Sequence, residues 1–372
     1  MEDAVSDGAT ELKVGLLAPP WVPVPPPSYG GTEAVVDRLA RGLVAAGHEV
    51  LLFASGDSTC PVPKVADTLA ARPDEIGITT VELAHVIQGH DALSSCDIIH
   101  DHTLAGPAIG RRRGAPVLVT TSHGPFTEEV SQVYRSFARR VPIIAISHAQ
   151  AVQGSLHGVH VTRVIHHGLD PDEITPGEGC GGYVLFLGRM HPDKGVDVAA
   201  RVAQSAGVRL VIAAKMREPA ERAWFEECVK PLLSDEITYV GEVSRTEAVE
   251  LLQGASALLN PIKWIEPFGL VMVEALAAGT PVVTFPIGAA PEIVEDGVTG
   301  YLCADEDEMA KRLIDAQALE RAACRAAVTA RFSTARVVED HVALYGRLIK
   351  ARQQAVGQTE GRPRPSQRRG AR

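Results

Sequence analysis

Along this chain, short apolar runs alternate with longer segments in which apolar residues recur at helical spacing. The alternation begins at Lys13 and begins again at Tyr183, after a loop that is rich in glycine and proline. Such alternation is typical of parallel sheets covered by helices. Because it occurs twice, the sequence predicts an α/β protein of two Rossmann-like domains, whose parallel sheets face each other across a deep cleft.

The expected strands occupy residues 14–18, 50–54, 98–100, 117–121 and 143–146 in the first half, and 184–187, 210–213, 237–240, 257–259, 282–285 and 301–303 in the second. The expected helices occupy residues 34–46, 196–204, 220–233, 246–252, 270–278, 291–295, 307–314, 319–330 and 335–350. Open sheets of this kind bind ligands beyond the carboxyl ends of their strands. The predicted ligand site therefore lies in the cleft.

A chain of 372 residues is longer than one hydrophobic core usually supports. We expect a flexible N-terminus over residues 1–12, an N-terminal domain over 13–170, a linker over 171–182, a C-terminal domain over 183–330 and a last helix over 331–352. Residues 353–372 carry arginines among glycine, proline, glutamine and serine, which predicts a disordered basic tail.

The composition excludes several classes of protein. The formal net charge of −10 argues against a nucleic-acid-binding surface. No apolar run reaches the roughly 18 residues of a membrane span, although peripheral association with a membrane stays open. Residues 1–10 lack the basic start and apolar stretch of a secretion signal, so a cytoplasmic location is expected. The six cysteines are widely spaced, which predicts reduced thiols.

Two groups of histidines raise the question of a metal site. They are His100 with His102, and the adjacent His166 and His167. Histidines that alternate or adjoin at strand ends, with no further acidic cluster, do not make a ligand set. We therefore predict that the protein has no metal site.

The first candidate site is the pair Gly30 and Gly31, which follows a proline-rich loop and opens the first long helix. Glycines let the backbone approach a ligand closely, and a helix N-terminus presents unpaired N–H groups to an anion such as a diphosphate. An ordinary helix start capped by Thr32 explains the same residues equally well. The residues alone leave both interpretations open.

The second candidate pairs Arg189 with Lys194, after the first strand of the second half. Arginine can bind a phosphate as a two-pronged donor and lysine as a point charge. Two solvated surface cations are the simpler alternative. Their place at the carboxyl end of a strand, between Gly188 and Gly195, favours anion binding.

The third candidate is Glu266, just before a helix, with Glu274 inside that helix. At about 1.5 Å per helical residue, the carboxylates lie about 12 Å apart or less, which suits two hydroxylated ends of one ligand. A carboxylate in an apolar helix needs hydrogen-bond donors, and ribose hydroxyls would supply them to Glu274. Glu266 has an alternative explanation, because the helix dipole favours acids near helix starts without any ligand.

The fourth candidate is His123, at the end of an N-terminal strand that faces the cleft. A histidine there can donate a hydrogen bond to a sugar hydroxyl or stabilise charge. Most single histidines are structural or solvated, so this residue carries little weight alone.

In this order, the motifs resemble those of the retaining glycosyltransferases of family four, which have the GT-B fold of two facing Rossmann-like domains. The resemblance covers nearly all of residues 13–350. It is carried by Gly30-Gly31, His123-Gly124, Ile146-Ser147, Gly188-Arg189 with Lys194-Gly195, Glu266 and Glu274 with seven residues between them, the run from Gly279 to Val283, and the run from Pro291 to Tyr301.

The resemblance implies roles for these residues, with the N-terminal domain binding the acceptor and the C-terminal domain binding the donor. Donor binding is implied for Gly30, Gly31, Arg189, Lys194, Lys215, Glu266, Phe268, Gly269, Leu270 and Glu274, with the diphosphate at Arg189 and Lys194 and the ribose at Glu274. A catalytic role is implied for His123, Glu266, Arg189 and Lys194, and acceptor binding for Tyr29, Phe126 and Glu128. The last helix is expected to cross back to the N-terminal domain.

The implied activity is the transfer of a hexose-type sugar from a nucleoside-diphosphate sugar, such as a UDP- or GDP-sugar, to a hydroxyl group of a small molecule or saccharide. Glu266 and Glu274 are assigned to the donor, which leaves no carboxylate nucleophile for double displacement. The expectation is therefore front-face retention without a metal or a cofactor. The alternatives are a nucleotide-sugar epimerase of the same fold and a non-catalytic nucleotide-sugar-binding protein.

Overall fold

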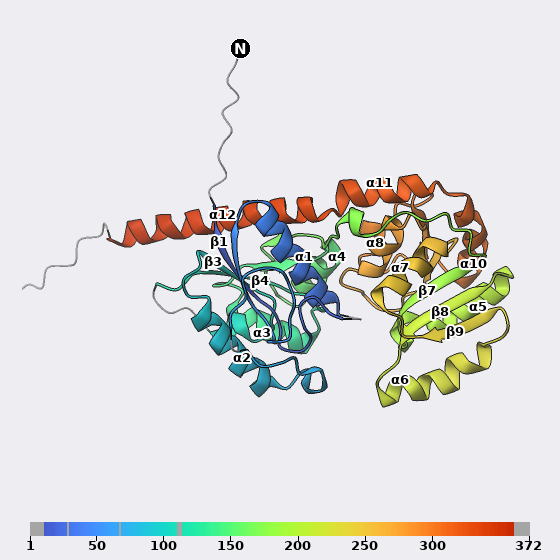
Figure 1. Ribbon diagram of the computed structural model, residues 1–372, viewed down its shortest axis with the longest axis horizontal. Helices are drawn as coiled ribbons and strands as arrows, with labels where there is room; N and C mark the ends of the chain where they lie inside the picture. The colour runs from blue at the N-terminus through green and yellow to red at the C-terminus, as the bar shows by residue number, and fades with distance from the viewer. Residues whose placement is uncertain (1–10, 28–29, 67, 110–113, 361–372) are drawn as a thin grey trace, which may run out of the picture.

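The computed structural model describes residues 11–27, 30–66, 68–109 and 114–360, and it has two lobes side by side (Figure 1). The strands of the N-terminal lobe are β1 (Lys13–Leu17), β2 (Glu49–Phe53), β3 (Ile98–Asp101), β4 (Val117–Thr121), β5 (Ile143–Ala145) and β6 (Arg163–Val164). Its helices are α1 (Gly31–Ala45), α2 (Thr79–Ala92), α3 (Glu128–Phe137) and α4 (His148–Leu156).

The strands of the C-terminal lobe are β7 (Val184–Arg189), β8 (Leu210–Lys215), β9 (Ile237–Gly241), β10 (Leu258–Asn260), β11 (Val282–Thr284) and β12 (Gly300–Leu302). Its helices are α5 (Val196–Ala206), α6 (Pro219–Trp224), α7 (Arg245–Gly254), α8 (Leu270–Ala277), α9 (Ala290–Ile293), α10 (Glu306–Asp315) and α11 (Arg321–Arg331), and α12 (Thr334–Glu360) follows them.

Each lobe contains one six-stranded parallel sheet. The order is β2-β1-β3-β4-β5-β6 in the N-terminal lobe and β12-β11-β10-β7-β8-β9 in the C-terminal lobe. Buried apolar residues cover both faces of each sheet, which explains why most of the strands are predominantly apolar. The two-domain α/β expectation is confirmed.

The strand order places the ligand site. In a sheet of this kind the chain reverses its direction of winding at one point, and the loops there separate to leave a crevice. In the C-terminal lobe this point lies between β7 and β10, which pair directly through Leu185 and Leu258. The loops after these two strands carry Lys194 and Glu266 respectively, so the topology brings these residues together.

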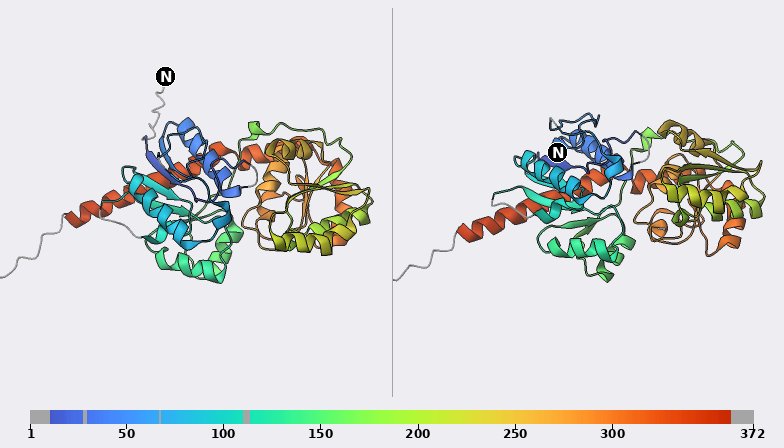
Figure 2. Two further views of the ribbon diagram at one scale, coloured as in Figure 1. Left: turned by 60° about the horizontal axis from the view of Figure 1, so that its bottom comes forward. Right: turned by 90° about the horizontal axis from the view of Figure 1, so that it is seen from below.

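Two segments connect the lobes, and they lie against each other. The Leu169 N–H donates to the Phe332 carbonyl at 2.9 Å, and the Thr334 N–H donates to the Leu169 carbonyl at 2.9 Å. Helix α12 then runs from this crossing along the N-terminal lobe, as all three views show (Figures 1 and 2). Val338, Leu344 and Tyr345 of α12 join the core that α1 forms with its sheet.

Several expected elements differ from the structure. Helix α12 continues to Glu360, so residues 353–360, expected to be disordered, are helical; glutamine and alanine at 353–355 favour a helix, and no proline follows before Pro363. The helix expected over 220–233 ends at Trp224 and continues as a π turn and a 3₁₀ turn, with Pro231 in the latter. Strand β6 was not anticipated.

No helix in the described part of the chain is both long and apolar enough to cross a bilayer.

Two helical glycines test the packing of α12 on α1. A Cβ on Gly42 of α1 would lie 2.6 Å from Val338 Cγ2, whereas a Cβ on Gly346 of α12 would meet nothing within 4 Å. Alanine normally stabilises a helix interior over glycine by about 0.5–1 kcal/mol. We therefore expect Gly346→Ala to raise the thermal unfolding midpoint and Gly42→Ala to lower it. Equal stabilisation by both substitutions, measured by calorimetry, would show that α12 does not pack closely here.

Candidate active site

A cleft of about 870 Å³ lies between the lobes and is lined by both of them. This volume is in the range of small-molecule sites. The structure brings together in it most of the residues singled out by sequence, namely Gly30, Gly31, His123, Arg189, Lys194, Lys215, Glu266, Phe268, Gly269, Leu270 and Glu274.

At the reversal point of the C-terminal sheet, Lys194 and Glu266 form an ion pair. The Lys194 ammonium donates to both Glu266 oxygens, at 2.7 and 2.6 Å, and both side chains are mostly buried. The two loops meet closely because Gly195, at φ 70°, has no Cβ; a Cβ there would lie 2.0 Å from the Pro261 carbonyl oxygen. The expected phosphate-binding lysine therefore already has a carboxylate partner.

Arg189, at the end of β7, also has carboxylate partners. Its guanidinium donates to Glu221 and, at 2.8 Å, to Glu218, both at the start of α6. Burial alone would raise the pKa of Glu221, but hydrogen bonds from Arg189 and from two backbone N–H groups outweigh it, so that pKa is lowered. Arg189 is thus held in the cleft by a carboxylate that stays charged.

Glu274 has charged hydrogen-bond donors within the protein, so its carboxylate does not need ribose hydroxyls in order to be buried. Arg245 of α7 donates to Glu274 at 2.9 Å, and Arg38 of α1 approaches the same oxygen at 3.5 Å from the opposite lobe. Burial lowers the pKa of Arg38, and its Nη1 atom has no hydrogen-bond partner among the described residues. Neither arginine was singled out by the sequence, because a buried carboxylate indicates that donors exist but not which residues supply them.

The start of α8 offers backbone N–H groups to the cleft. Gly269 caps the helix at φ 103°, in the left-handed region that favours glycine, and no side chain caps the first turn. Leu270 opens the helix at the cleft surface, whereas the Phe268 ring is buried in the core. The backbone at the start of α8 is therefore open to a donor in the cleft. The Phe268 ring is buried and is not available to a donor.

The Gly30-Gly31 loop opens α1 without a side-chain cap. Gly30 is the capping residue, so Thr32 is not the cap that the simpler explanation required. A Cβ on Gly30 would lie 2.7 Å from Pro26 Cβ, so glycine is needed for the loop to pack. Glu33, in the first turn, is buried, and desolvation raises its pKa to about 7.

His123 lines the cleft from the N-terminal lobe and belongs to a cluster of buried histidines. Its Nε2 lies 2.9 Å from His102 Nδ1, and its ring stacks on His167 with centroids 5.2 Å apart. Burial, with a smaller contribution from His341, lowers the pKa of His123 to about 3. The imidazole is therefore neutral at physiological pH, so it can donate or accept one hydrogen bond but carries no charge.

The acceptor residues expected from sequence do not form one group. Phe126 is fully buried in the N-terminal core, and Glu128 pairs with Arg135 and His157 at the outer end of α3, so neither lines the cleft. The structure therefore does not place either residue at the cleft wall, and an acceptor-binding role for them stays a prediction. Tyr29 lies outside the described residues.

Two family models match the chain. The model described as Glycosyltransferase Family 4 matches residues 29–173, and the model described as Glycosyl transferases group 1 matches residues 181–318. With the two facing Rossmann-like lobes, these matches show that the chain belongs to the glycosyltransferases of the GT-B fold, in family four. The expected family and fold are confirmed.

Individual proteins resemble the whole chain. The D-inositol 3-phosphate glycosyltransferase of Mycolicibacterium smegmatis is 28% identical over 99% of this chain and 97% of that protein, and the enzyme of the same name from Mycobacterium avium is 28% identical over 91% and 94%. Among solved structures, the avilamycin A biosynthesis glycosyltransferase AviGT4 has a TM-score of 0.67 at 25% identity, covering 91% of this chain and 98% of that one. The Thermosynechococcus elongatus sucrose-phosphate synthase, with a TM-score of 0.76 at 21% identity over 92% and 100%, shares the fold.

Glu33 gives a prediction about pH. Its ordinary pKa is 4.5 and its folded pKa is about 7, so between these values the folded state binds more protons than the unfolded state. Glu33 therefore does not destabilise the folded state below pH 4.5, where it is protonated in both states. As the pH rises from 4.5 to 7, it lowers the free energy of unfolding. We expect Glu33→Gln to have a higher thermal unfolding midpoint than the wild type at pH 8. Near pH 4.5 the two midpoints should be similar. The exposed Glu250→Gln is the control; the same pH dependence in both variants would refute the assignment.

Proposed function

We propose that this glycosyltransferase moves a hexose-type sugar from a nucleoside-diphosphate sugar to an acceptor hydroxyl, with retention of anomeric configuration and without a metal ion. The observation that supports this most strongly is the arrangement at the C-terminal wall. The cations Arg189 and Lys194 line one cleft together with the carboxylates Glu266 and Glu274. The start of α8, which no side chain caps, lies in the same cleft.

The proposed donor lies along this wall. Its diphosphate is bound by Arg189 and Lys194, with α8 backbone N–H groups beside it, because both cations line the cleft at the carboxyl end of β7. Its ribose hydroxyls donate hydrogen bonds to Glu274, and the transferred sugar lies near Glu266 and His123. Lys215 pairs in register with Arg189 on the next strand, which puts a third cation within reach of the nucleotide.

Negative charge builds up on the diphosphate as the bond to the sugar breaks. Arg189, Lys194 and the helix amides stabilise that charge electrostatically, so the proposed chemistry does not require a metal. Glu266 is assigned to hydroxyls of the transferred sugar and Glu274 to the ribose, which leaves no carboxylate to act as the nucleophile of a double displacement. The incoming hydroxyl then attacks from the face that the phosphate leaves, and the phosphate oxygen takes its proton.

The acceptor belongs to the N-terminal side of the cleft. Among the described residues, Pro25, Pro26, His123, Ile146 and His167 form this wall close to the transferred sugar. The similarity to enzymes named D-inositol 3-phosphate glycosyltransferase makes a polyhydroxylated ring a reasonable acceptor to test first. A saccharide hydroxyl fits the same wall.

Donor binding is testable with a matched pair of arginine variants. We expect a UDP- or GDP-sugar to raise the unfolding midpoint of the wild type, and Arg189→Ala to weaken binding about tenfold or more, since hydrogen bonds to charged groups contribute about 1.5–3 kcal/mol. Arg201→Ala is the control, because Arg201 lies on α5 and pairs with Glu306 and Asp197 outside the cleft. A thermal-shift panel of nucleotide sugars measures both.

Three outcomes would count against the proposal. If no nucleotide sugar stabilises the wild type, or if Arg189→Ala leaves the shift unchanged, the donor site is wrongly assigned. If product analysis finds an epimerised donor, the protein is an epimerase of the same fold. If the donor binds but is neither transferred nor slowly hydrolysed with any acceptor tested, the non-catalytic alternative replaces the enzyme.

A further inference from the structure

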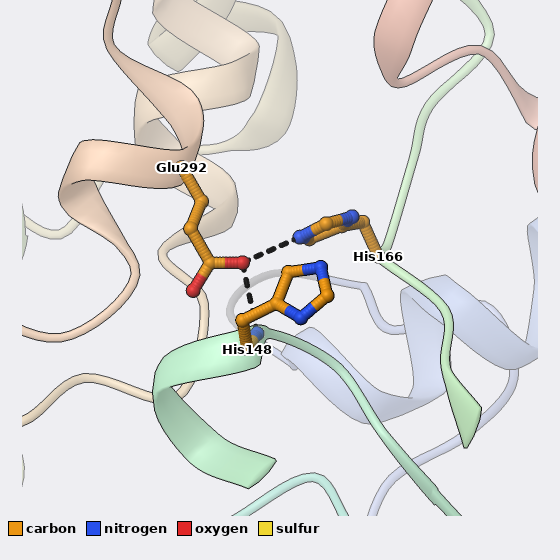
Figure 3. A group of neighbouring side chains, drawn as sticks. All are labelled: His148, His166 and Glu292. Atoms are coloured by element: carbon orange, nitrogen blue, oxygen red, sulfur yellow. Dashed lines mark hydrogen bonds and ion pairs between the residues drawn. The ribbon is translucent and has the colours of Figure 1, made fainter. Parts of the chain in front are cut away.

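A second cluster of functional side chains lies at the joint between the lobes, outside the residues that line the cleft. It contains His148 at the start of α4, His166 after β6, and Glu292 of α9 (Figure 3). One ligand atom from each residue can be chosen so that all three lie within 4.8 Å of one another. The two histidines belong to the N-terminal lobe and the glutamate to the C-terminal lobe.

Glu292 is held in a fixed orientation. Its two carboxylate oxygens accept hydrogen bonds from the backbone N–H groups of His148 and Ala149, each at 2.8 Å, and His166 Nε2 lies 2.7 Å from one of these oxygens. Arg331 also donates to the Glu292 backbone carbonyl. The bonds from α4 do not use the histidine rings, so they stay in place if the rings take another partner.

The ligand set has the chemistry of a zinc site. Two imidazoles and a carboxylate are the donors that Zn²⁺ takes in protein sites with a fourth, open position, whereas Mg²⁺ and Ca²⁺ prefer oxygen ligands alone. The backbone bonds to Glu292 would orient the carboxylate in the way that outer hydrogen bonds orient metal ligands. The imidazoles must be neutral to bind, and His166 would carry its proton on Nδ1.

The geometry needs only small changes. Zn–N and Zn–O bonds of about 2.0–2.2 Å put the ligand atoms of a tetrahedral site roughly 3.3 Å apart. His166 and Glu292 would separate from 2.7 Å by about 0.6 Å on this basis. His148 must move closer, and it can, because its ring is exposed at the first turn of α4 and its one described ring contact is with His166.

We propose that His148, His166 and Glu292 bind one Zn²⁺ ion at the joint between the two lobes, with water as the fourth ligand. This proposal departs from the sequence-based expectation of no metal, which considered the histidines without Glu292, a residue far from them in the sequence. A bound ion would link the N-terminal lobe to the C-terminal lobe. The proposal does not depend on the proposed activity, and the ion takes no part in sugar transfer.

The test is titration calorimetry of Zn²⁺ into full-length protein without an affinity tag. We expect one ion per chain, and an affinity at least about tenfold weaker in His148→Ala. His160→Ala is the matched control, since His160 is an exposed histidine near α4 outside the cluster, and it should bind as the wild type does. Co²⁺ should give the visible absorption of a four-coordinate site in the wild type and lose it in His148→Ala.

His148 is the residue to change first because its ring is exposed, so its loss should leave the fold intact. The expected companion result is that Zn²⁺ raises the unfolding midpoint of the wild type and not of His148→Ala. Zn²⁺ binding of equal strength in wild type and His148→Ala would overturn the proposal. An absence of saturable binding would also overturn it and would leave the three residues as a hydrogen-bonded contact between the lobes.

Discussion

The cations and carboxylates at the carboxyl ends of the C-terminal strands neutralise one another, and the rest of the site depends on this pairing. Charges that are partly buried without a partner are costly, so the fold can hold them in a cleft only in pairs. Lys194 has Glu266, Arg189 has Glu221 and Glu218, and Glu274 has Arg245 and Arg38. Donor binding as proposed would therefore be an exchange of partners, in which phosphate and hydroxyl oxygens replace protein groups.

The proposed exchange of partners would also change a contact between the two lobes. Arg38 belongs to α1 of the N-terminal lobe and reaches Glu274 of the C-terminal lobe, so the carboxylate assigned to the ribose is already a contact between lobes. Glu292 makes a second such contact by capping α4. A third contact is the pair of backbone hydrogen bonds that joins the two connecting segments at Leu169 and Phe332. A ligand that draws Glu274 away from Arg38 would therefore alter one of these contacts and leave the others.

The sequence predicts the fold and the C-terminal wall well, because both depend on local patterns. Strand periodicity places Arg189, Lys194 and Glu266 at or just after strand ends, where the topology brings them together, and the helical spacing from Glu266 places Glu274 on α8 beside them. The partners of these charges could not be predicted, since Arg38, Arg245 and Glu221 reach them through the packing of helices distant in sequence. The burial of Phe126 could not be predicted for the same reason: a loop's path under or over a sheet is decided by tertiary contacts.

If Lys194 binds the donor phosphate as proposed, it must first leave Glu266, to which it donates both of its observed hydrogen bonds. Titration calorimetry of UDP into wild type and Glu266→Gln measures this directly. We expect the variant to bind UDP more tightly than the wild type, although it would transfer sugar poorly. Unchanged or weaker UDP binding by Glu266→Gln would contradict the exchange of partners on which this description of the active site rests.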